Sequence, residues 1–336
     1  MKINILYKIS DHPLGGGNQF LKALKKQFLD MSVYEEDPSK ADIILFNSHH
    51  QLNDILKLKY RYSEKIFVHR IDGPVGQYRG DNCNLDTLLY EFNNLVADAT
   101  IFQSNWSKLE NKNRGIRNNI ECTIINAPDK GIFNTKDKIN FDNDKKIRLI
   151  ATSWSKNYNK GFDIYKYLDQ KLDFSKYEMI FVGNSPIDFD NIKWIKPLDS
   201  FRLSKELKNS DIYITASKKD PCSNSLIEAL HCGLPCVALK DGGHPEIIGV
   251  AGEFFEDEQD VLAKIDKVAS NYKYYKDNIV VHDIDEVAKK YYVFFSDLHK
   301  NYNNGKLGTK KIDFSLFLKF LFKIFIFPIK CKIKNF

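Results

Sequence analysis

The sequence predicts an α/β fold made of two doubly wound, Rossmann-like domains, and three observations support this prediction. Short apolar runs alternate with helical patterns along most of the 336 residues, which is typical of parallel sheets covered by helices on both faces. A polar and charged segment over residues 134–146 has no apolar periodicity and separates two such series. The length also suffices for two ordinary α/β domains with separate cores.

Each series is defined by short apolar runs that we expect to be strands. A helix over residues 19–28 is expected after the first of them. The strands of the first series are residues 3–7, 43–46, 66–68, 99–102 and 120–125. Those of the second series are residues 148–152, 179–182, 212–216 and 236–239, with a short piece near 253–255. We therefore expect one domain over residues 1–140 and another over residues 147–283.

The end of the chain adds a helix and an amphipathic tail. A helix over residues 284–300 carries its large apolar side chains on one stripe. In the tail, residues 306–336, the run from 312 to 329 is rich in Phe, Leu and Ile. A narrow polar stripe recurs at every fourth position, at Lys311, Ser315, Lys319 and Lys323.

This tail predicts a helix that lies in a membrane interface. The apolar run is shorter than the ~20 residues that span a bilayer, and we expect Pro328 to break it. Three lysines, Lys330, Lys332 and Lys334, then add attraction to anionic lipid. The alternative is a helix packed on the body of the protein or on a partner.

Charge and cysteine content exclude several classes of protein. The net charge is +6, but residues 306–336 contain eight Lys and one Asp, so residues 1–305 carry −1. A neutral body with a basic tail argues against a broad nucleic-acid-binding face. The six cysteines include no Cys-x-x-Cys pair, and the chain starts with a strand-like run rather than a signal peptide. We therefore expect a cytoplasmic protein without a zinc site.

The most informative motif begins at Asp220 and reads Asp-Pro-Cys-Ser-Asn-Ser-Leu-Ile-Glu, followed by Ala-Leu-His-Cys-Gly-Leu-Pro. It sets Asp220 and Glu228 eight positions apart across the start of a helix, which Ser223 can cap and Gly233 ends. Unpaired amides at the helix start can receive a phosphate, and we expect this of Asn224 and Ser225. The two carboxylates are better suited to accept hydrogen bonds from sugar hydroxyls.

This motif resembles the donor-site signature of glycosyltransferase family 4, in which an acid is followed after seven residues by Glu, then Ala, then Gly-x-Pro. The first acid here is Asp220 rather than the usual Glu. The resemblance implies the GT-B architecture, in which two domains face a cleft and the last helix crosses back to the first domain. It further implies that Glu228 binds the nucleotide ribose and Asp220 the donor sugar.

A Lys-Gly pair in the second domain also resembles this family. Lys160 and Gly161 begin the helix after the strand at residues 148–152, and Lys160 can meet the donor pyrophosphate as a point charge. The family usually carries an Arg shortly after that strand, and here the stretch ends in Lys156, which we expect to substitute. The alternative is that both lysines are solvated turn residues.

Two glycine loops of the second domain fit the same site. Gly183 ends a strand and matches the nucleotide-facing loop of the family. Gly242 and Gly243 follow another strand and allow close backbone approach to a ligand. His244 comes next, and we expect an exposed loop histidine there; the alternative is a contact with phosphate or sugar.

In the first domain, polar residues follow two strands. His69 matches the family histidine that faces the transferred sugar, and Asp72 lies three residues further on, where it can pair with Arg70. Three glycines follow the first strand and expose amides that suit phosphate or sugar; they are Gly15, Gly16 and Gly17. They do not complete a Gly-x-Gly-x-x-Gly pattern and no P-loop lysine follows, which argues against a dehydrogenase and an ATPase.

Together these features predict a glycosyltransferase that uses a nucleotide sugar, either a UDP-sugar or a GDP-sugar. The family resemblance implies a retaining mechanism with no obligatory metal or other cofactor. The tail favours a lipid-linked glycan acceptor, peripheral attachment to the inner face of the cell membrane, and a role in bacterial surface polysaccharides such as lipopolysaccharide. The alternatives are a nucleotide-sugar- or carbohydrate-binding protein that has lost catalysis, and a nucleotide-sugar epimerase.

Overall fold

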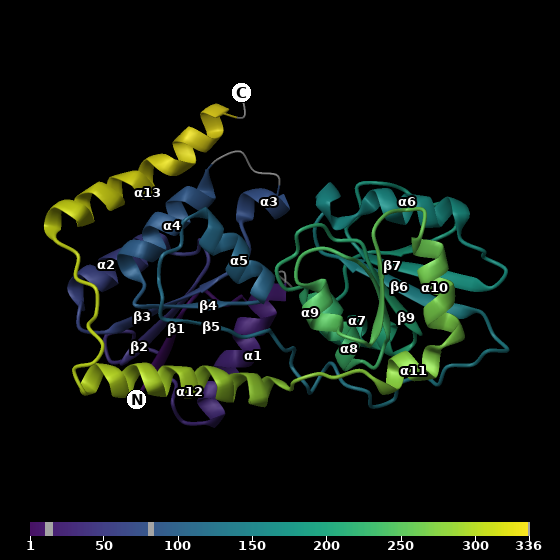
Figure 1. The fold of residues 1–336 in the computed structure, drawn as a ribbon, viewed down its shortest axis with the longest axis horizontal. Helices are drawn as coiled ribbons and strands as arrows, with labels where there is room; N and C mark the ends of the chain where they lie inside the picture. The colour runs from purple at the N-terminus through teal and green to yellow at the C-terminus, as the bar shows by residue number, and fades with distance from the viewer. Residues whose placement is uncertain (11–15, 80–83, 335–336) are drawn as a thin grey trace. The chain divides into compact units, whose positions relative to one another are not determined.

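The computed structural model of the protein describes residues 1–10, 16–79 and 84–334. It divides into two compact units (Figure 1). Unit 1 comprises Met1–Ile9, Leu21–Ile125 and Asp285–Phe336, and unit 2 comprises Ser10–Phe20 and Asn126–Ile284. Each unit contains one parallel sheet with its own buried core, so the α/β prediction is confirmed.

The sheet of unit 1 has five parallel strands in the order β1-β2-β3-β4-β5. They are β1 (Ile3–Leu6), β2 (Ile43–Asn47), β3 (Ile66–Ile71), β4 (Ala99–Phe102) and β5 (Glu121–Thr123). Each lies at an apolar run that the sequence predicts, because the buried strands of a covered parallel sheet are apolar on both faces. Strand β3 is three residues longer than the run at 66–68, and its added residues are polar in part.

In unit 1 the chain adds backbone pairs on both edges of β1, so the order in which the sheet is built changes direction at this strand. Ile3 of β1 forms a parallel bridge with Tyr34, whereas β2 pairs with β1 on its other edge. The chain therefore leaves β1 toward one side, through α1 (Gly16–Asp30), and returns to build β2 to β5 on the other side. Open α/β sheets bind ligands outside the carboxyl ends of the two strands that flank such a switch point, here β1 and β2.

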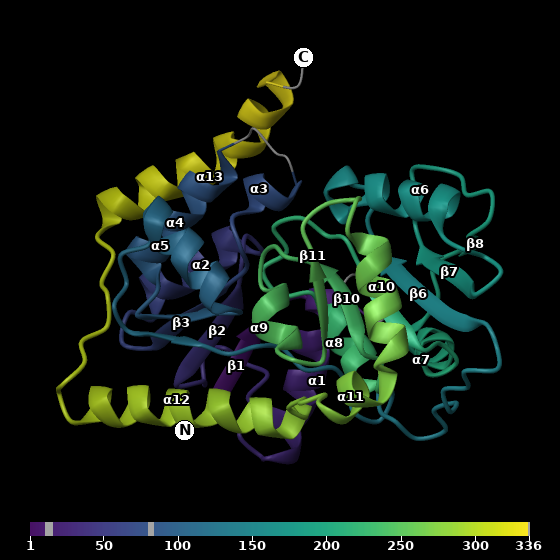
Figure 2. The same ribbon diagram turned by 45° about the vertical axis from the view of Figure 1, so that its right-hand side comes forward.

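Helices cover both faces of this sheet. On one face, α2 (Leu52–Arg61) and α4 (Leu85–Val96) pack on β2 and β3 with a core that includes Phe46, Phe67 and Phe92. The C-terminal helix α13 (Phe314–Lys334) lies over α2 and α4 (Figures 1 and 2). Helix α12 (Ile284–Asn303) confirms the helix expected from residue 284, and its Phe295 contacts Phe28 of α1. The remaining helices of unit 1 are α3 (Val75–Arg79) and α5 (Asn105–Arg114).

The sheet of unit 2 has six parallel strands in the order β11-β10-β9-β6-β7-β8. They are β6 (Ile147–Ser153), β7 (Tyr177–Gly183), β8 (Lys193–Ile195), β9 (Ile212–Thr215), β10 (Cys236–Leu239) and β11 (Gly252–Phe255). From β6 the chain builds β7 and β8 on one side and then β9 to β11 on the other. The switch point of unit 2 therefore lies between β6 and β9.

The helices of unit 2 follow these strands in alternation. They are the 3-10 turn η1 (Tyr158–Lys160), α6 (Phe162–Lys171), α7 (Ser200–Lys208), α8 (Asn224–His231), α9 (His244–Ile248), α10 (Val261–Ser270) and α11 (Tyr272–Asp277). Strand β8 is missing from the sequence prediction, because it is a three-residue edge strand that starts with Lys193 and has no apolar run.

Residues 126–140 belong to unit 2, although we expected the first domain to extend to residue 140. Side-chain and backbone groups of these residues form specific hydrogen bonds there. Asn126 donates to the Oδ1 atom of Asn224 at 3.0 Å, and the backbone N–H of Ile139 donates to the carbonyl of Lys208 at 3.1 Å. A polar segment without periodicity can thus be ordered by hydrogen bonds that its pattern does not reveal.

The tail differs from its prediction in one respect. The expected break at Pro328 is wrong, because α13 is continuous from Phe314 to Lys334. A proline inside a helix removes one N–H donor and weakens one turn, but it does not end every helix that contains it. Across the described ranges, no helix is both long enough and apolar enough to cross a bilayer.

Candidate functional site

Three neighbouring strands of unit 2 bring polar groups together at their carboxyl ends. Lys160 follows β6, Asp220 follows β9, and Gly242 and Gly243 follow β10. The Nζ atom of Lys160 lies 2.9 Å from Oδ2 of Asp220, so this ion pair connects the loops on the two sides of the switch point. The backbone N–H of Gly243 donates to the carbonyl of Asp220 at 2.8 Å. This is the edge at which open α/β sheets bind ligands.

The carboxylate of Asp220 is ionised although only 12% of its side chain is exposed. Burial raises the pKa of Asp220, but the charge of Lys160 and its hydrogen bond outweigh burial and hold the pKa below its ordinary value. The site therefore contains a charged acceptor whose main partner is a lysine. An anionic ligand can compete with Asp220 for that lysine.

Gly242 is required by this geometry. Its φ angle is +61°, and a Cβ atom added at this position would lie 2.2 Å from the carbonyl oxygen of Asp220. Any other residue would both strain the backbone and push the loop after β10 away from Asp220. Gly242 thus allows two loops to approach each other closely, whereas its contact with a ligand remains a prediction.

His244 is fully buried, so the expectation of an exposed loop histidine is wrong. Its Nδ1 atom lies 2.9 Å from the carbonyl oxygen of Leu239. Because a carbonyl oxygen only accepts, Nδ1 carries the proton. Burial lowers the pKa of His244, so the ring is neutral and Nε2 is an acceptor. This Nε2 atom has no hydrogen-bond partner within the described part of the chain.

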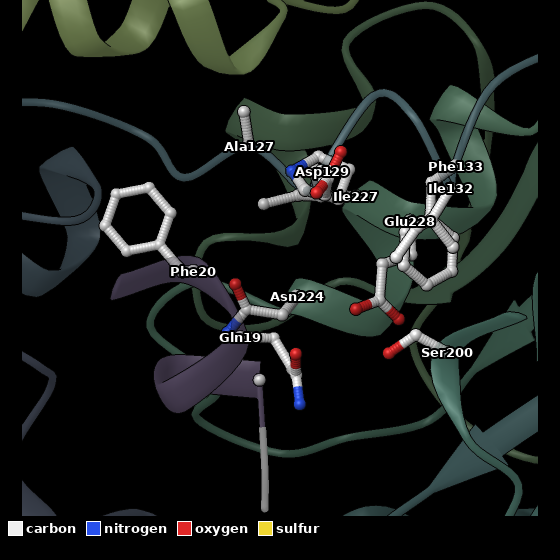
Figure 3. Close-up of a pocket in the computed structure, with 12 residues that line it drawn as sticks. Gln19, Phe20, Ala127, Asp129, Ile132, Phe133, Ser200, Asn224, Ile227 and Glu228 are labelled. Carbon is white, nitrogen blue, oxygen red and sulfur yellow. The ribbon is translucent and has the colours of Figure 1, made fainter. Parts of the chain in front are cut away.

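Glu228 lies on α8 and lines a pocket whose residues all belong to unit 2 (Figure 3). The pocket encloses about 360 Å³, part of which is open to solvent. In Figure 3 the carboxylate of Glu228 faces the same part of the pocket as the hydroxyl of Ser200. The other lining residues are Gly16, Gln19, Phe20, Ala127, Pro128, Asp129, Ile132, Phe133, Asn224 and Ile227.

The pKa of Glu228 is strongly perturbed in this pocket. Burial alone raises its pKa from 4.5 to about 8. No hydrogen bond or ion pair to the carboxylate is present among the described residues. A half-buried acid that lacks a partner and faces a pocket is typical of a binding site, because a ligand that donates hydrogen bonds would compensate the cost of burial.

The start of α8 differs in detail from its prediction. Ser223 is the N-cap residue, but its hydroxyl makes no capping bond, so that part of the prediction is wrong. Instead its Oγ lies 3.3 Å from Oγ of Ser225. Asn224 lines the pocket and accepts from Asn126. Phosphate binding by Asn224 and Ser225 remains a prediction.

The glycines after the first strand have different surroundings. A Cβ atom added to Gly16 would lie 2.4 Å from Cβ of Asn224, so Gly16 allows the start of α1 to pack closely on the start of α8. A Cβ atom added to Gly17 would contact nothing within 4 Å. Gly15 lies outside the described residues. Gly16 therefore serves the packing of two helices, and the contact with phosphate or sugar that the sequence suggested for these glycines remains a prediction.

Gly183 and Lys156 lie near the ends of β7 and β6. Gly183 is the last residue of β7, with a φ angle of +132°, and its added Cβ atom would lie 1.9 Å from the carbonyl oxygen of Ser153. The strand ends can approach only because this residue is glycine. Lys156 is exposed in the loop after β6 and has no ion-pair partner in the described chain. The nucleotide-binding roles of both residues remain predictions.

His69 is a structural residue, so the prediction that it follows the strand and faces the sugar is wrong. It lies inside β3, has no exposed surface and stacks on Phe46. Nε2 donates to the carbonyl of Ser48 at 3.0 Å, and Nδ1 lies 3.1 Å from Nδ2 of Asn93. Burial lowers the pKa of His69 to about 4. Both ring nitrogens are therefore occupied, and the ring is neutral.

Asp72 lies just beyond β3 and belongs to a small polar cluster. Its Oδ1 is 3.5 Å from Nη1 of Arg70 and accepts from the side-chain amide of Gln103. The expected pairing of Arg70 with Asp72 is confirmed. About a quarter of the Asp72 side chain, 26%, is exposed at the carboxyl end of the sheet.

Sequence reasoning missed Tyr7 and His50, which lie together at the switch point of unit 1. Tyr7 follows β1 and His50 follows β2, and their ring centroids are 5.1 Å apart in an edge-to-face arrangement. Ser48 and Gln51, on either side of the histidines, are non-glycine residues with φ angles of 47° and 55°. Such backbone strain is often concentrated at functional sites. This switch point is visible only from the isolated bridge of Tyr34. A single bridge produces no apolar run, so the sequence pattern did not indicate it.

Metal ligands are not grouped in the part of the chain that the structure describes. There, no group of three or more His, Cys, Asp or Glu side chains is placed to hold a metal ion. That the protein needs no obligatory metal remains a prediction.

The second unit of the chain matches a known family. Residues 134–279 match the family model described as Glycosyl transferases group 1. A curated relative, "Uncharacterized protein 356" of Sulfolobus islandicus rod-shaped virus 1, is 23% identical over an alignment of 203 positions that covers 55% of this chain. The match spans 56% of that relative, little more than half its length.

Solved structures with the GT-B fold are similar to almost the whole chain. Anabaena Alr3699/HepE in complex with UDP and glucose has a TM-score of 0.68 at 17% identity and covers 89% of this chain and 100% of its own. Sucrose-phosphate synthase of Thermosynechococcus elongatus has a TM-score of 0.64 at 11% identity, and the match covers 90% of this chain and 98% of the synthase. The lipopolysaccharide outer core galactosyltransferase WaaB has a TM-score of 0.60 at 14% identity, and the match covers 91% of this chain and 100% of WaaB. The chain therefore has the GT-B fold.

Proposed function

We propose that this protein is a nucleotide-sugar-dependent glycosyltransferase whose unit 2 binds the donor. The match of residues 134–279 to group 1 glycosyl transferases and the GT-B fold support this activity. Membership of family 4 is the finer proposal, supported by the motif from Asp220 to Glu228. The single observation that carries the donor site is Glu228, a carboxylate without a partner that faces a pocket.

Glu228 is suited to bind the ribose of the nucleotide. A ribose presents two neighbouring hydroxyls, and an ionised carboxylate can accept a hydrogen bond on each oxygen. The apolar part of the pocket, which includes Phe20 and Phe133, provides a surface for the rest of the nucleoside. We propose a UDP-sugar as the donor to test first, because HepE, to which the chain is similar, is described in complex with UDP and with UDP-glucose.

Lys160 and Asp220 are suited to exchange partners when the donor binds. The donor diphosphate would pair with Lys160 and release Asp220, whose carboxylate can then accept from a hydroxyl of the donor sugar. Negative charge increases on the diphosphate as the bond to the sugar breaks, so Lys160 stabilises the transition state more than the ground state. The backbone amide of Ser225 and the exposed Lys156 are the further groups that we assign to the diphosphate.

We assign acceptor binding to the switch point of unit 1, where Tyr7 and His50 lie beside each other. Aromatic and imidazole rings present both an apolar face and a polar atom, which suits a sugar acceptor. Asp72 at the end of the neighbouring strand β3 is the third group of this site. The acceptor that we propose is a lipid-linked glycan of a bacterial surface polysaccharide. The apolar and basic tail of the chain supports this choice.

Replacing His50 by alanine is expected to raise the KM for the acceptor roughly tenfold, because one or two contacts worth about 1 kcal/mol would be lost. The Kd of the nucleotide should stay within about twofold, since unit 2 is unchanged. His282 is an exposed histidine in unit 2, and His282→Ala is the matched control. A nucleotide Kd that changes with an unaltered acceptor KM would contradict the assignment.

A transfer assay tests the proposed function. Nucleotide sugars with different bases and sugars are screened by thermal shift, since a ligand that binds only the folded state raises the melting temperature. Release of nucleoside diphosphate is then measured with and without glycan acceptors. We expect transfer, with the anomeric configuration of the donor retained in the product by NMR. Binding without turnover would instead support a protein that has lost catalysis, and conversion of the donor without acceptor would support an epimerase.

A further inference from the structure

The C-terminal helix α13 has two apolar faces, and unit 1 buries only one of them. Phe320 and Ile324, with Ile312 just before the helix, are less than a tenth exposed and join the core formed with α2 and α4. Partly buried side chains extend this contact along the helix. Figure 2 shows α13 lying against these helices along most of its length.

Polar contacts fix α13 on unit 1 in one orientation. The backbone N–H of Lys310 donates to Oδ1 of Asp98 at 2.7 Å, and its Nζ donates to the carbonyl of Asn94 at 2.9 Å. Asp98 is itself fully buried and paired with Lys59 at 2.8 Å. Further along, Lys323 forms an ion pair with Glu91. The helix is therefore part of unit 1 rather than a loose tail.

The opposite face of α13 carries a stripe of exposed large apolar side chains, which we call the α13 stripe. They follow one another at intervals of four, four and three residues, so they lie on one side of the helix. The exposed fractions are 60% for Phe314, 46% for Leu318, 66% for Phe322 and 67% for Phe325. The stripe is roughly 17 Å long, from a helical rise of 1.5 Å per residue. A continuous exposed apolar surface of this kind is typical of an interaction site.

The charge around the stripe favours an anionic partner. Residues 306–336 carry +7, whereas residues 1–305 carry −1. Lys311 and Lys319 are exposed near the stripe. The one acid of this segment, Asp313, accepts the backbone N–H of Leu316 at 2.9 Å and so caps the helix start. A straight apolar stripe beside lysines is the pattern of helices that lie in the interface of an anionic membrane.

We propose that the α13 stripe inserts into the surface of an anionic lipid membrane while the other face of α13 stays packed on unit 1. Unit 1, with its acceptor site, is then held directly at the lipid surface. The sequence suggested two alternatives, a membrane helix and a helix packed on the body, and the packed face and the exposed stripe of α13 allow both at once. Attachment of α13 to lipid does not depend on the chemistry of the donor site.

Flotation of the full-length protein with lipid vesicles tests this proposal. We expect the wild type to partition at least tenfold more strongly into vesicles with 30% phosphatidylglycerol than into pure phosphatidylcholine, with weaker binding in 0.5 M NaCl because salt screens the lysines. The triple variant Leu318→Ser, Phe322→Ser and Phe325→Ser should lose at least tenfold in binding. Its melting temperature should be unchanged, because these side chains are exposed.

The matched control removes exposed apolar side chains elsewhere. Leu109 and Phe201 are 59% and 66% exposed, and the double variant Leu109→Ser and Phe201→Ser should bind vesicles like the wild type. Equal binding by the wild type and the triple variant would overturn the proposal. So would a wild type that fails to bind vesicles, or one that forms a dimer in size-exclusion chromatography that the triple variant cannot form. Nucleotide binding should be the same in all three proteins, which separates this test from that of the donor site.

Discussion

Replacing Glu228 by glutamine is expected to weaken nucleotide binding about 100-fold, because the two ribose hydroxyls would lose the charged acceptor that they share. Hydrogen bonds to a charged group contribute about 1.5–3 kcal/mol each, and a loss of about 2.7 kcal/mol corresponds to 100-fold in Kd. Isothermal titration calorimetry with the best nucleotide of the screen measures the change. An unchanged Kd would show that Glu228 does not contact the ligand.

The same substitution is expected to stabilise the protein without ligand. Burial raises the pKa of Glu228 from 4.5 to about 8. Between pH 4.5 and about 8, Glu228 is therefore protonated in the folded state and ionised in the unfolded state. The stabilising effect of this protonation is complete below pH 4.5 and is lost as the pH rises through about 8. Stability should thus fall by up to about 1.4 kcal/mol per pH unit in this window.

Glu228→Gln has no such proton, so its free energy of unfolding should exceed that of the wild type near pH 8 and the excess should vanish near pH 4. Denaturant unfolding at several pH values measures it. Glu258 is an exposed acid of the same unit, and Glu258→Gln is the matched control, which should leave both stability and binding unchanged. A wild type and a Glu228→Gln variant with parallel pH profiles would contradict the raised pKa.

Nucleotide binding should also release protons from the wild type. Hydrogen bonds from the ribose favour the ionised carboxylate and lower the pKa of Glu228, so at pH 7 binding expels the proton and affinity rises toward pH 8. Titrations in two buffers with different ionisation enthalpies count the released protons. The count should fall to near zero in Glu228→Gln.

Replacing Lys160 by alanine is the second change with a large expected effect. The transfer rate should fall about 100- to 1000-fold, which is typical when one preorganised group that stabilises transition-state charge is removed. The fall should appear mainly in kcat, because the negative charge on the diphosphate increases as the sugar leaves. Steady-state kinetics with saturating donor measures it.

Two controls separate this role from a structural one. Lys218 is also in unit 2 and pairs with Asp163 at 2.6 Å, with both side chains about half exposed. An exposed pair contributes little, so Lys218→Ala should retain the activity of the wild type within about twofold. Lys160→Arg should restore part of the activity of Lys160→Ala, since it keeps the charge. If Lys160→Ala has a normal kcat and a normal fold, the proposed role is wrong.

The sequence predicts the sheets well because buried parallel strands are apolar along their whole length. The strands at residues 99–102 and 236–239 have the expected bounds. Strand β8 has no such signal, since an edge strand can be polar. The motif from Asp220 to Glu228 likewise locates the loop after β9 and the pocket on α8, because its residue types follow from the loop-to-helix geometry.

Individual side chains are harder to place. A histidine beside a short apolar run looks the same whether the strand ends before it or continues. For His69 the hydrogen bonds with the carbonyl of Ser48 and with the side chain of Asn93 decide the matter. The burial of His244 depends in the same way on a contact with Leu239. The switch point of unit 1 depends on the single bridge of Tyr34, which local periodicity does not encode.

The two faces of α13 show the same limit at the level of a whole helix. Its sequence is apolar on most sides, which allows both a membrane and a protein contact. Only the packing on α2 and α4 shows which apolar residues are already used. The narrow polar stripe with its lysines predicts an anionic surface near the helix. It does not predict which face of the helix points toward that surface.

A crystal structure of the protein with a nucleoside diphosphate tests the central claim, a donor site in unit 2, most directly. We expect the ribose hydroxyls within hydrogen-bond distance of the Glu228 carboxylate. The diphosphate should lie against Lys160, which has separated from Asp220. A nucleotide bound away from both Glu228 and Lys160 would contradict the account.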